Sequence, residues 1–432
     1  VDVLHRASVP EDVLIHLPGL GETAGRPLVE SPDVDMIAFT GSKAVGAWIY
    51  ERAAQVRLTK GGLKRALTEM GGKNAIIVFP DADLDEAVAG ILHSTFGHAN
   101  QKCSACSRVF IHRSIYHRLV GRLVEGARSL PIGPADDPGT VINPLIEQEA
   151  CARVRAAAAV ARVEGRVLLD MLELPGASPW NLGPLIVELP PERLAELRTA
   201  QEEIFGPVLA VAPFDTEDEA IAYANNTVYG LTAGIFSRSP ATIRRMIRAI
   251  RAGNIYVNRE ITGARVGIEP FGGMGMSGTG PKAGGEEYLW AFVTRQEGFR
   301  PCDAAPAGRS EGGTATQVRI WMAAPKTRLA SLERAARLLE TRGERSSAEA
   351  IRQVLAHAGE ITEPQPTRRV PGQQNWVDWQ TPRGVGAVVA DGGSSSEALA
   401  GMVTGALLSG NGVLVIPAAE HRPAAERLAR AL

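Results

Sequence analysis

Short apolar runs alternate with longer amphipathic segments along most of the chain. Asn74–Val78 and Val109–Ile111 have the length and composition that predict buried strands. Between them, apolar residues recur at the spacing of a helix face, as Leu84, Val88 and Leu92 do. Strands that alternate with helices in this way predict an α/β fold with parallel, doubly wound sheets.

The same reasoning predicts further elements before residue 263. The other predicted strands are Val13–Leu17, Asp35–Phe39, Val208–Pro213, Gly234–Phe236 and Ile255–Val257. The predicted helices are Lys43–Gln55, Asp83–Ala99, Arg113–Ala127, Glu147–Glu164, Glu217–Asn225 and Ala241–Ala252.

Beyond residue 262 the pattern changes twice. Gly263–Phe299 is rich in glycine and should be mostly loop. Cys302–Thr316 is rich in Pro, Gly, Ser and Ala and is typical of a linker. Ser331–Ala358 is predicted to be helical, and Gly384–Leu432 to be strand, helix, strand and helix. The chain should therefore carry a separate C-terminal domain.

Composition narrows the class of protein. Of the 432 residues, 45% are apolar and 22% charged, and the formal net charge is -2. This balance is typical of a globular protein and gives no electrostatic reason to expect a nucleic acid partner. No apolar run approaches the roughly 18–20 residues that cross a bilayer, and no signal peptide opens the chain. Few, scattered cysteines argue against a disulfide framework, so we expect a cytoplasmic protein.

Cys103 is the first candidate for chemistry. It lies on a predicted connection between a helix and a strand, where a thiol can be reached, and the neighbouring Lys102 and Arg108 would favour its thiolate. Cys103 and Cys106 also have C-x-x-C spacing, but no second ligand pair supports zinc, and the order of elements is wrong for a thioredoxin-like site. We therefore expect no metal site; an incidental buried cysteine remains the alternative.

Two other features accompany this thiol. Glu69 ends one element before a Gly-Gly turn, where a carboxylate could project into a cleft as a general base, although a solvated surface glutamate fits equally well. Thr40, Gly41 and Ser42 lie where a strand ends and a helix begins, which is a place for phosphate or a simple helix cap by Ser42.

Five motifs in one order change the weight of these observations. They are Phe-Thr-Gly-Ser (39–42), Glu-Met-Gly-Gly-Lys (69–73), Gln-Lys-Cys (101–103), Glu-Glu-Ile-Phe-Gly-Pro-Val (202–208) and Pro-Phe-Gly-Gly (270–273). Over residues 1–296 the chain resembles the aldehyde dehydrogenase superfamily in order and spacing. The segments 101–108, 253–259 and 277–285 are most similar to L-glutamate γ-semialdehyde dehydrogenase, as in the C-terminal part of bifunctional proline utilization A. Asn100 replaces a usual glycine and could perturb the loop that holds Cys103, and Glu286 stands where proline is common.

The resemblance implies specific roles. Cys103 would attack the aldehyde, and Glu69 would activate the water that releases the acid. The cofactor NAD would be bound by Thr40, Gly41 and Ser42 at its pyrophosphate and by Glu203 and Phe205 at its nicotinamide end. The residues that would contact the substrate are Lys102, Ser104, Gly284 and Gly285. L-Glutamate γ-semialdehyde is the expected substrate, and another semialdehyde such as succinate semialdehyde is the alternative.

The resemblance also divides the chain. The expected parts are residues 1–67 (the rest of an NAD-binding domain), 68–262 (catalytic), 263–300 (substrate loop and return segment), 301–320 (linker) and 321–432. Because the chain begins in mid-domain at Val1, we expect the family's Trp-Asn and Lys-Pro-Ala-Glu motifs, and so a competent enzyme, to need residues before it.

Residues 384–389 and 405–418 resemble that missing stretch, but Asp391–Ser394 and Ile416 stand at its functional positions. We therefore expect residues 321–432 to form a degenerate Rossmann-like domain that acts as a non-catalytic lid or assembly module. A homo-oligomer, and an FAD-containing proline dehydrogenase domain in the full protein, complete the expectations.

Overall fold

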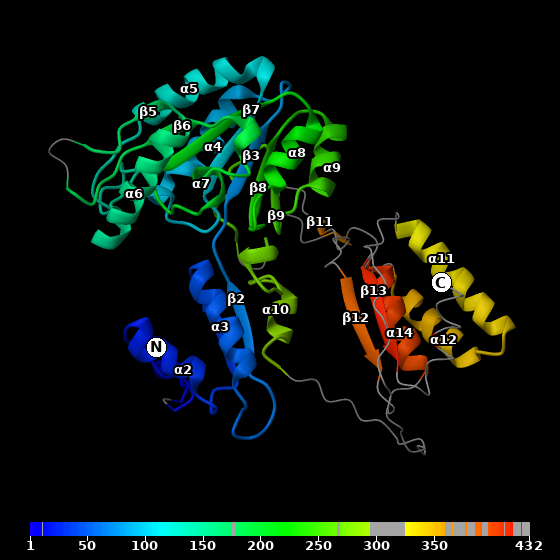
Figure 1. Ribbon diagram of the computed structural model, residues 1–432. Coiled ribbons are helices and arrows are strands. Elements are labelled where there is room, and N and C mark those ends of the chain that lie inside the picture. The colour runs from blue at the N-terminus through cyan, green and yellow to red at the C-terminus, as the bar shows by residue number, and fades with distance from the viewer. Residues whose placement is uncertain are drawn as a thin grey trace. The chain divides into compact units, whose positions relative to one another are not determined.

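The computed structural model describes residues 1–10, 12–174, 178–265, 268–293, 325–358, 365–366, 376–377, 385–390, 396–409, 411–417 and 425. The chain forms two compact units, Val1–Thr294 and Arg295–Leu432 (Figure 1).

The first unit opens with a two-stranded parallel sheet. Strand β1 (Met36–Thr40) pairs with β2 (Arg65–Glu69), and helix α3 (Lys43–Gln55) connects them. The predicted strand near residue 35 and the predicted helix 43–55 are confirmed. The register places Thr40 beside Glu69, so both strands end at the same edge. Since β2 pairs here, the change from one sheet to the next falls after Glu69 rather than at residue 67.

The segment before β1 differs from the prediction. It contains α1 (Asp2–Arg6), the π-helical turn η1 (Gly21–Gly25) and α2 (Arg26–Glu30). The predicted strand Val13–Leu17 is wrong: among the described residues this run pairs with no strand, and its alternate residues Val13, Ile15 and Leu17 are all exposed. Apolar alternation makes a strand only where a neighbour supplies the ladder of hydrogen bonds.

A seven-stranded sheet forms the larger part of the first unit (Figure 1). Its order is β5-β6-β7-β4-β3-β8-β9, and each neighbouring pair is parallel except β5 and β6. The strands are β3 (Asn74–Val78), β4 (Cys106–His112), β5 (Arg166–Asp170), β6 (Leu185–Glu188), β7 (Val208–Phe214), β8 (Thr232–Phe236) and β9 (Asn254–Val257). Strands β3 and β8 are buried at every position, as central strands covered on both faces should be.

The connections wind this sheet on both faces. Helix α4 (Leu84–Phe96) connects β3 to β4, and α8 (Glu217–Asn225) connects β7 to β8. These two connections run in opposite directions along the strand order, so right-handed crossovers place the helices on opposite faces. Helix α5 (Tyr116–Arg128) packs against α4, α9 (Pro240–Ala249) against α8, and α6 (Gln148–Glu164) against β5 and β6. The predicted strands and helices between residues 68 and 262 are thus confirmed, while β5 and β6 were not predicted.

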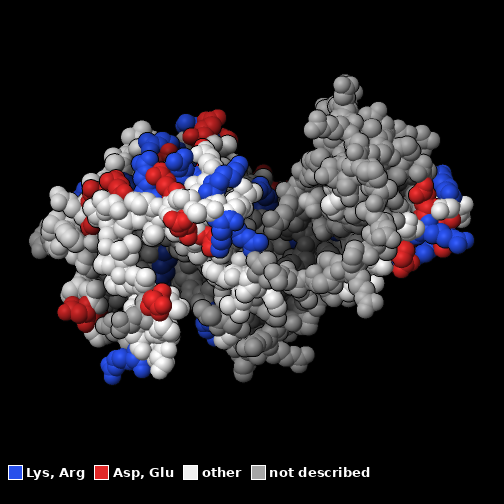
Figure 2. Space-filling model, turned by 90° about the horizontal axis from the view of Figure 1, so that it is seen from below, with Lys and Arg blue, Asp and Glu red and all other residues white. Residues whose placement is uncertain are grey.

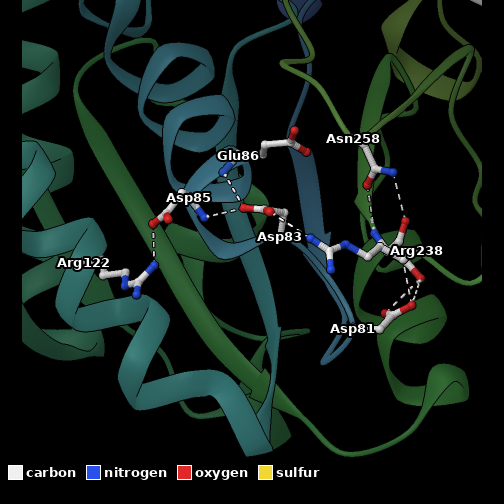
Figure 3. Close-up of polar contacts among 8 residues, drawn as sticks. Asp81, Asp83, Asp85, Glu86, Arg122, Arg238 and Asn258 are labelled. Carbon is white, nitrogen blue, oxygen red and sulfur yellow. Dashed lines mark hydrogen bonds and ion pairs between the residues drawn. The ribbon is translucent and has the colours of Figure 1, made fainter.

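Polar side chains close the carboxyl ends of β3, β8 and β9 (Figure 3). The Asp81 carboxylate accepts hydrogen bonds from the Ser237 hydroxyl (3.0 and 2.9 Å) and the Arg238 N–H (2.9 Å). Asn258 accepts from the Ser237 N–H and donates to the Ser237 carbonyl. Asp83 caps α4 and pairs with Arg238. These contacts fix the carboxyl ends of the three strands, and none of them involves the amino end of the sheet.

The glycine-rich segment, as far as residue 293, joins the two sheets. It contains the short turns η5 (Gly275–Ser277) and α10 (Glu286–Trp290), and is otherwise loop as predicted. The Met70 N–H donates to the Ser277 carbonyl (2.8 Å), and the Thr279 N–H donates to the Thr68 carbonyl (3.0 Å). The loop therefore pairs with the end of β2 and holds it in place.

The second unit contains a strand–helix–strand motif. Strands β12 (Val385–Ala390) and β13 (Gly412–Pro417) are parallel, and α14 (Ser396–Leu408) connects them. The helix predicted over 331–358 is two helices, α11 (Pro325–Thr341) and α12 (Arg345–Ala356), because Gly343 takes a left-handed φ of 84° between them. The short strands β10 (Gln365–Pro366) and β11 (Trp376–Val377) pair antiparallel. The predicted linker and final helix lie outside the described residues.

The described surface carries mixed charge. On the face in Figure 2, Lys and Arg side chains lie beside Asp and Glu side chains, and ion pairs such as Arg113 with Asp215 are typical of it. No helix of the described residues combines the length and hydropathy that crossing a membrane requires.

A substitution of Arg108 can test what holds the seven-stranded sheet together. Its guanidinium is buried and donates to the carbonyls of Lys73, Tyr223, Ala224 and Asn226. Replacing Arg108 with Met should lower the free energy of unfolding by about 3 kcal/mol, because these buried acceptors lose a charged donor.

Urea unfolding of the variant measures this cost. Arg113→Met is the matched control: its exposed pair with Asp215 should contribute about 0–1 kcal/mol. Equal losses in the two variants would contradict a structural role for the buried guanidinium.

Candidate active site

The candidate site forms where the carboxyl ends of β1 and β2 meet the amino ends of β3 and β4. Residues 70–73 alone separate β2 from β3. The Gly41 N–H donates to the Glu69 carbonyl (3.0 Å), which keeps the ends of β1 and β2 together. Cys103 lies three residues before β4. Ligands of open α/β sheets usually bind at carboxyl ends; here the second sheet contributes its amino end.

Glu69, the predicted base, points into the glycine-rich loop. A Cβ on Gly272 would lie 3.1 Å from Glu69 Oε1, and one on Gly278 would lie 3.2 Å from Oε2. Among the described residues, buried Oε2 has no hydrogen-bond partner. Burial raises the pKa of Glu69 to about 7, while the positive charge of Lys282 acts in the opposite direction. A carboxylate that titrates near neutrality is suited to general base catalysis.

Cys103 is half-buried and is held by Asn74, a residue that the sequence analysis did not single out. The Asn74 amide donates to the carbonyls of Cys103 (2.7 Å) and Ala105 (2.8 Å). Its oxygen accepts from the Thr232 N–H on β8 (3.0 Å). One buried side chain therefore ties the thiol loop to two strands. The sequence did contain a signal for this role, because Asn74 is a polar residue at the start of an otherwise apolar strand.

The loop before Cys103 is strained. His98, Ala99 and Asn100 have left-handed φ values of 56°, 53° and 63°, a conformation that costs non-glycine residues roughly 1–2 kcal/mol each. Asn tolerates it best, and the Asn100 amide donates to the carbonyls of Thr95 (2.7 Å) and Cys106 (2.8 Å). The residue that replaces the usual glycine therefore stabilises this loop rather than disturbing it.

The electrostatic expectation for Cys103 was wrong. Burial raises the pKa of the thiol, and the negative charges of Glu203 and Glu69 raise it further, although the N–H groups of Ser104 and Cys103 oppose them. Arg108 does not serve the thiol, because its guanidinium is committed to backbone carbonyls. If Cys103 is the nucleophile, as predicted, its thiol needs a base, and Glu69 is a carboxylate whose pKa is raised to about 7.

Glu203 closes the site from the other side. Its carboxylate accepts from the Gly72 N–H (2.9 Å), and a Cβ on Gly71 would overlap it at 2.0 Å. Any side chain at Gly71 would therefore displace the Glu203 carboxylate from its place beside the chain. Burial raises the pKa of Glu203, while Lys73 and Lys43 lower it. Phe205, two residues on, has a left-handed φ of 59°.

Thr40, Gly41 and Ser42 occupy the strand-to-helix turn, as predicted. The Ser42 hydroxyl caps α3 by accepting from the Val45 N–H (3.3 Å), so the simple capping role is present. The remaining N–H groups of this first turn are free of helical partners by geometry. The ammonium of Lys43, the first residue of α3, lies over the Tyr229 ring, 5.1 Å from its centroid. This contact brings the start of α3 close to the seven-stranded sheet.

The predicted substrate contacts lie on loops around Cys103 and before α10. Ser104 is buried, and its carbonyl accepts from the Thr232 hydroxyl (3.2 Å). Lys102 is half-buried. Gly284 has a left-handed φ of 73°, and Gly285 is the N-cap of α10. Their contact with a substrate remains a prediction.

These features agree with known proteins. The family model described as "Aldehyde dehydrogenase family" matches residues 1–297, and the chain belongs to this family. The family resemblance and the doubly wound α/β fold class are both confirmed. The chain is 42% identical over 289 residues to the 1-pyrroline-5-carboxylate dehydrogenase of Bacillus subtilis, a match that covers 67% of this chain and 55% of the relative. It therefore spans about half the length of such relatives.

Solved structures give the same result. A 1-pyrroline-5-carboxylate dehydrogenase from Thermus with bound NAD is 40% identical with a TM-score of 0.64, covering 67% of this chain and 55% of that one. Proline utilization A from Bdellovibrio bacteriovorus, inactivated by N-propargylglycine, is 44% identical with a TM-score of 0.64. That match covers 70% of this chain and 32% of the other.

The Asn74 clamp can be tested through the thiol. Asn74→Ala should slow alkylation of Cys103 by iodoacetamide roughly tenfold, because the loop loses about 1–3 kcal/mol of hydrogen bonding that fixes the sulfur. Mass spectrometry of the labelled residue gives the rate. Asn181→Ala is the control, since that amide donates to a carbonyl, that of Gly133, in another loop. An unchanged rate in Asn74→Ala would show that the clamp does not orient the thiol.

Proposed function

We propose that the full-length protein containing this chain oxidises L-glutamate γ-semialdehyde to L-glutamate with NAD. The observation that carries the proposal is the cluster of one thiol, Cys103, with two half-buried carboxylates, Glu69 and Glu203, whose charges both act on it. Relatives named 1-pyrroline-5-carboxylate dehydrogenase support this substrate.

The residues present fit a dinucleotide. Helix α3 begins at the carboxyl end of β1, and its first turn offers N–H groups and a positive dipole end to a pyrophosphate beside Gly41 and Ser42. Glu203 has one carboxylate oxygen on Gly72, which leaves the other for a ribose hydroxyl, and Phe205 lies two residues away. The bound NAD would supply a hydride acceptor.

The residues of this chain account for the other steps. Glu69 takes the proton of the Cys103 thiol as sulfur bonds to the aldehyde carbon, which gives a thiohemiacetal. The Cys103 N–H would stabilise the developing oxyanion. After oxidation the product is a thioester on Cys103. Once its first proton has passed to solvent, Glu69 takes a proton from water, whose oxygen bonds to the acyl carbon. As the C–S bond breaks, this proton passes to the sulfur, which releases the carboxylic acid and the free thiol.

The substrate carboxylate would bind at Lys102, Ser104, Gly284 and Gly285. The carboxylate of succinate semialdehyde lies one carbon closer to its aldehyde, and an anchor for this group is sensitive to that distance. The ratio of kcat/KM values for the two aldehydes therefore decides the substrate. We propose that residues 321–432 form a non-catalytic, aldehyde-dehydrogenase-like module, supported by the β12-α14-β13 unit.

The match to proline utilization A supports an associated FAD-containing proline dehydrogenase domain, and we infer a homo-oligomer. The free thiols of the described cysteines support a cytoplasmic location.

The two catalytic residues should fail in different ways. Cys103→Ala should give no NADH and still bind NAD. Glu69→Gln should release at most about one equivalent of NADH per site, and more slowly than the wild type because the thiol also loses its base. Turnover should then be roughly 100-fold to 10,000-fold slower, because the thioester is no longer hydrolysed. Stopped-flow absorbance of NADH measures both. Cys151→Ala, a buried thiol on α6, is the control. Full turnover by folded Cys103→Ala protein would refute the assignment.

The raised pKa of Glu69 predicts a pH dependence. The carboxylate is the active form, and its pKa is about 7; kcat should therefore rise with pH through about 7 when hydrolysis limits the rate. Measurements of steady-state kcat between pH 5.5 and 9 give the midpoint of this rise, the acidic limb of the profile. A midpoint near the ordinary glutamate value of about 4.3 would contradict the burial argument.

A further inference from the structure

Lys282 lies beside the predicted base and was assigned no role from the sequence. It is half-buried in the glycine-rich loop, and its ammonium donates to the Gly253 carbonyl just before β9. The same loop pairs with the end of β2 through an isolated bridge between Glu69 and Gly278 and through the bonds of Thr279. Loop and strand therefore hold this lysine and Glu69 in one place.

Gly272 shows how closely the two groups approach. A Cβ built on Gly272 would lie 3.1 Å from Glu69 Oε1, 3.1 Å from Lys282 Cα and 3.3 Å from Lys282 Cγ. The absence of a side chain at Gly272 therefore lets the lysine stem and the Glu69 carboxylate approach the same point in the structure.

A line of charges leads from the buried base outward. Glu69 is partly buried, Lys282 is half-buried and Glu287, on α10, is exposed. Burial lowers the pKa of Lys282 to about 8, while Glu287 and Glu69 raise it. Cys103 lies on the other side, where Glu69 raises the pKa of its thiol. The charge of Glu69 thus interacts with Lys282 and with the Cys103 thiol, which Glu69 would deprotonate in the proposed reaction.

We propose that Lys282 is a positioning residue that keeps the Glu69 carboxylate ionised and aimed at the thioester, with Glu287 keeping Lys282 charged. This inference rests on the proposed function of Glu69. Desolvation alone would protonate the base at neutral pH; the neighbouring ammonium offsets part of that cost. The Gly253 carbonyl fixes the ammonium, so the charge acts from a set point rather than from a mobile side chain.

Lys282→Met and Lys282→Arg in the full-length protein test the proposal. Loss of the charge in Lys282→Met should move the acidic limb of kcat upward by about one pH unit, so that kcat at pH 6.5 falls roughly tenfold or less while kcat at pH 9 stays within about twofold. Lys282→Arg should restore most of the wild-type limb. A purely structural role would lower kcat at all pH values without moving the limb.

The control is Lys64→Met. Lys64 is also buried and also donates to backbone carbonyls, those of Leu28, Val29 and Ser31, but Asp35 is the carboxylate that acts on it. Its loss should destabilise the protein without moving the limb. An unmoved limb in Lys282→Met, or an equal shift in Lys64→Met, would overturn the proposal.

A second readout needs no turnover. The pH profile of Cys103 alkylation should contain an inflection from Glu69, which disappears in Glu69→Gln and moves upward in Lys282→Met. If the wild type forms no NADH from the semialdehyde, the proposed function fails, and this profile still decides the role of Lys282. An inflection that does not move in Lys282→Met would overturn the proposed role of Lys282.

Discussion

Four residues between two parallel sheets constrain everything at this site. The chain leaves β2 at Glu69 and enters β3 at Asn74. Within that distance it must place the base, pass the Glu203 carboxylate at Gly71, donate to it from Gly72 and begin a fully buried strand. A side chain at Gly71 would displace the Glu203 carboxylate, and one at Gly72 would meet the Asn74 amide and the Cys103 carbonyl. The closeness of Cys103, Glu69 and Glu203 follows from this short connection.

The same geometry explains where the polar interactions are concentrated. The carboxyl ends of β3, β8 and β9 are closed by Asp81, Ser237 and Asn258, so their hydrogen bonds are satisfied locally. The amino ends are held by Asn74 and by the buried guanidinium of Arg108, and Asn74 fixes the Cys103 loop at its carbonyl. The left-handed turn at residues 98–100 is tolerated because Asn100 bonds on both sides of it.

Charge at the site is balanced rather than simply positive around the thiol. Burial raises the pKa values of Cys103, Glu69 and Glu203, and lysines oppose this shift at the two carboxylates. The cations next to Cys103 in the sequence are not those that matter, because a side chain's direction is set by its element: Arg108 turns into the sheet, whereas Lys282 and Lys73 come from distant segments to face the carboxylates. Neighbours along the chain were a poor guide to neighbours in space.

The sequence by itself determined the α/β class, nearly all strands and helices between residues 35 and 262, and the identity of Cys103 and Glu69 as candidates, because periodicity and ordered motifs are local signals. It could not exclude a strand at residues 13–17 or find β2, β5 and β6, since pairing partners and edges are not local. Only the tertiary structure decided that Asn74 clamps the thiol loop, that burial and two carboxylates raise the pKa of the thiol, and that Lys282 lies beside Glu69. Each depends on contacts between segments far apart in the chain, and burial, which sets the pKa values, exists only once those segments pack.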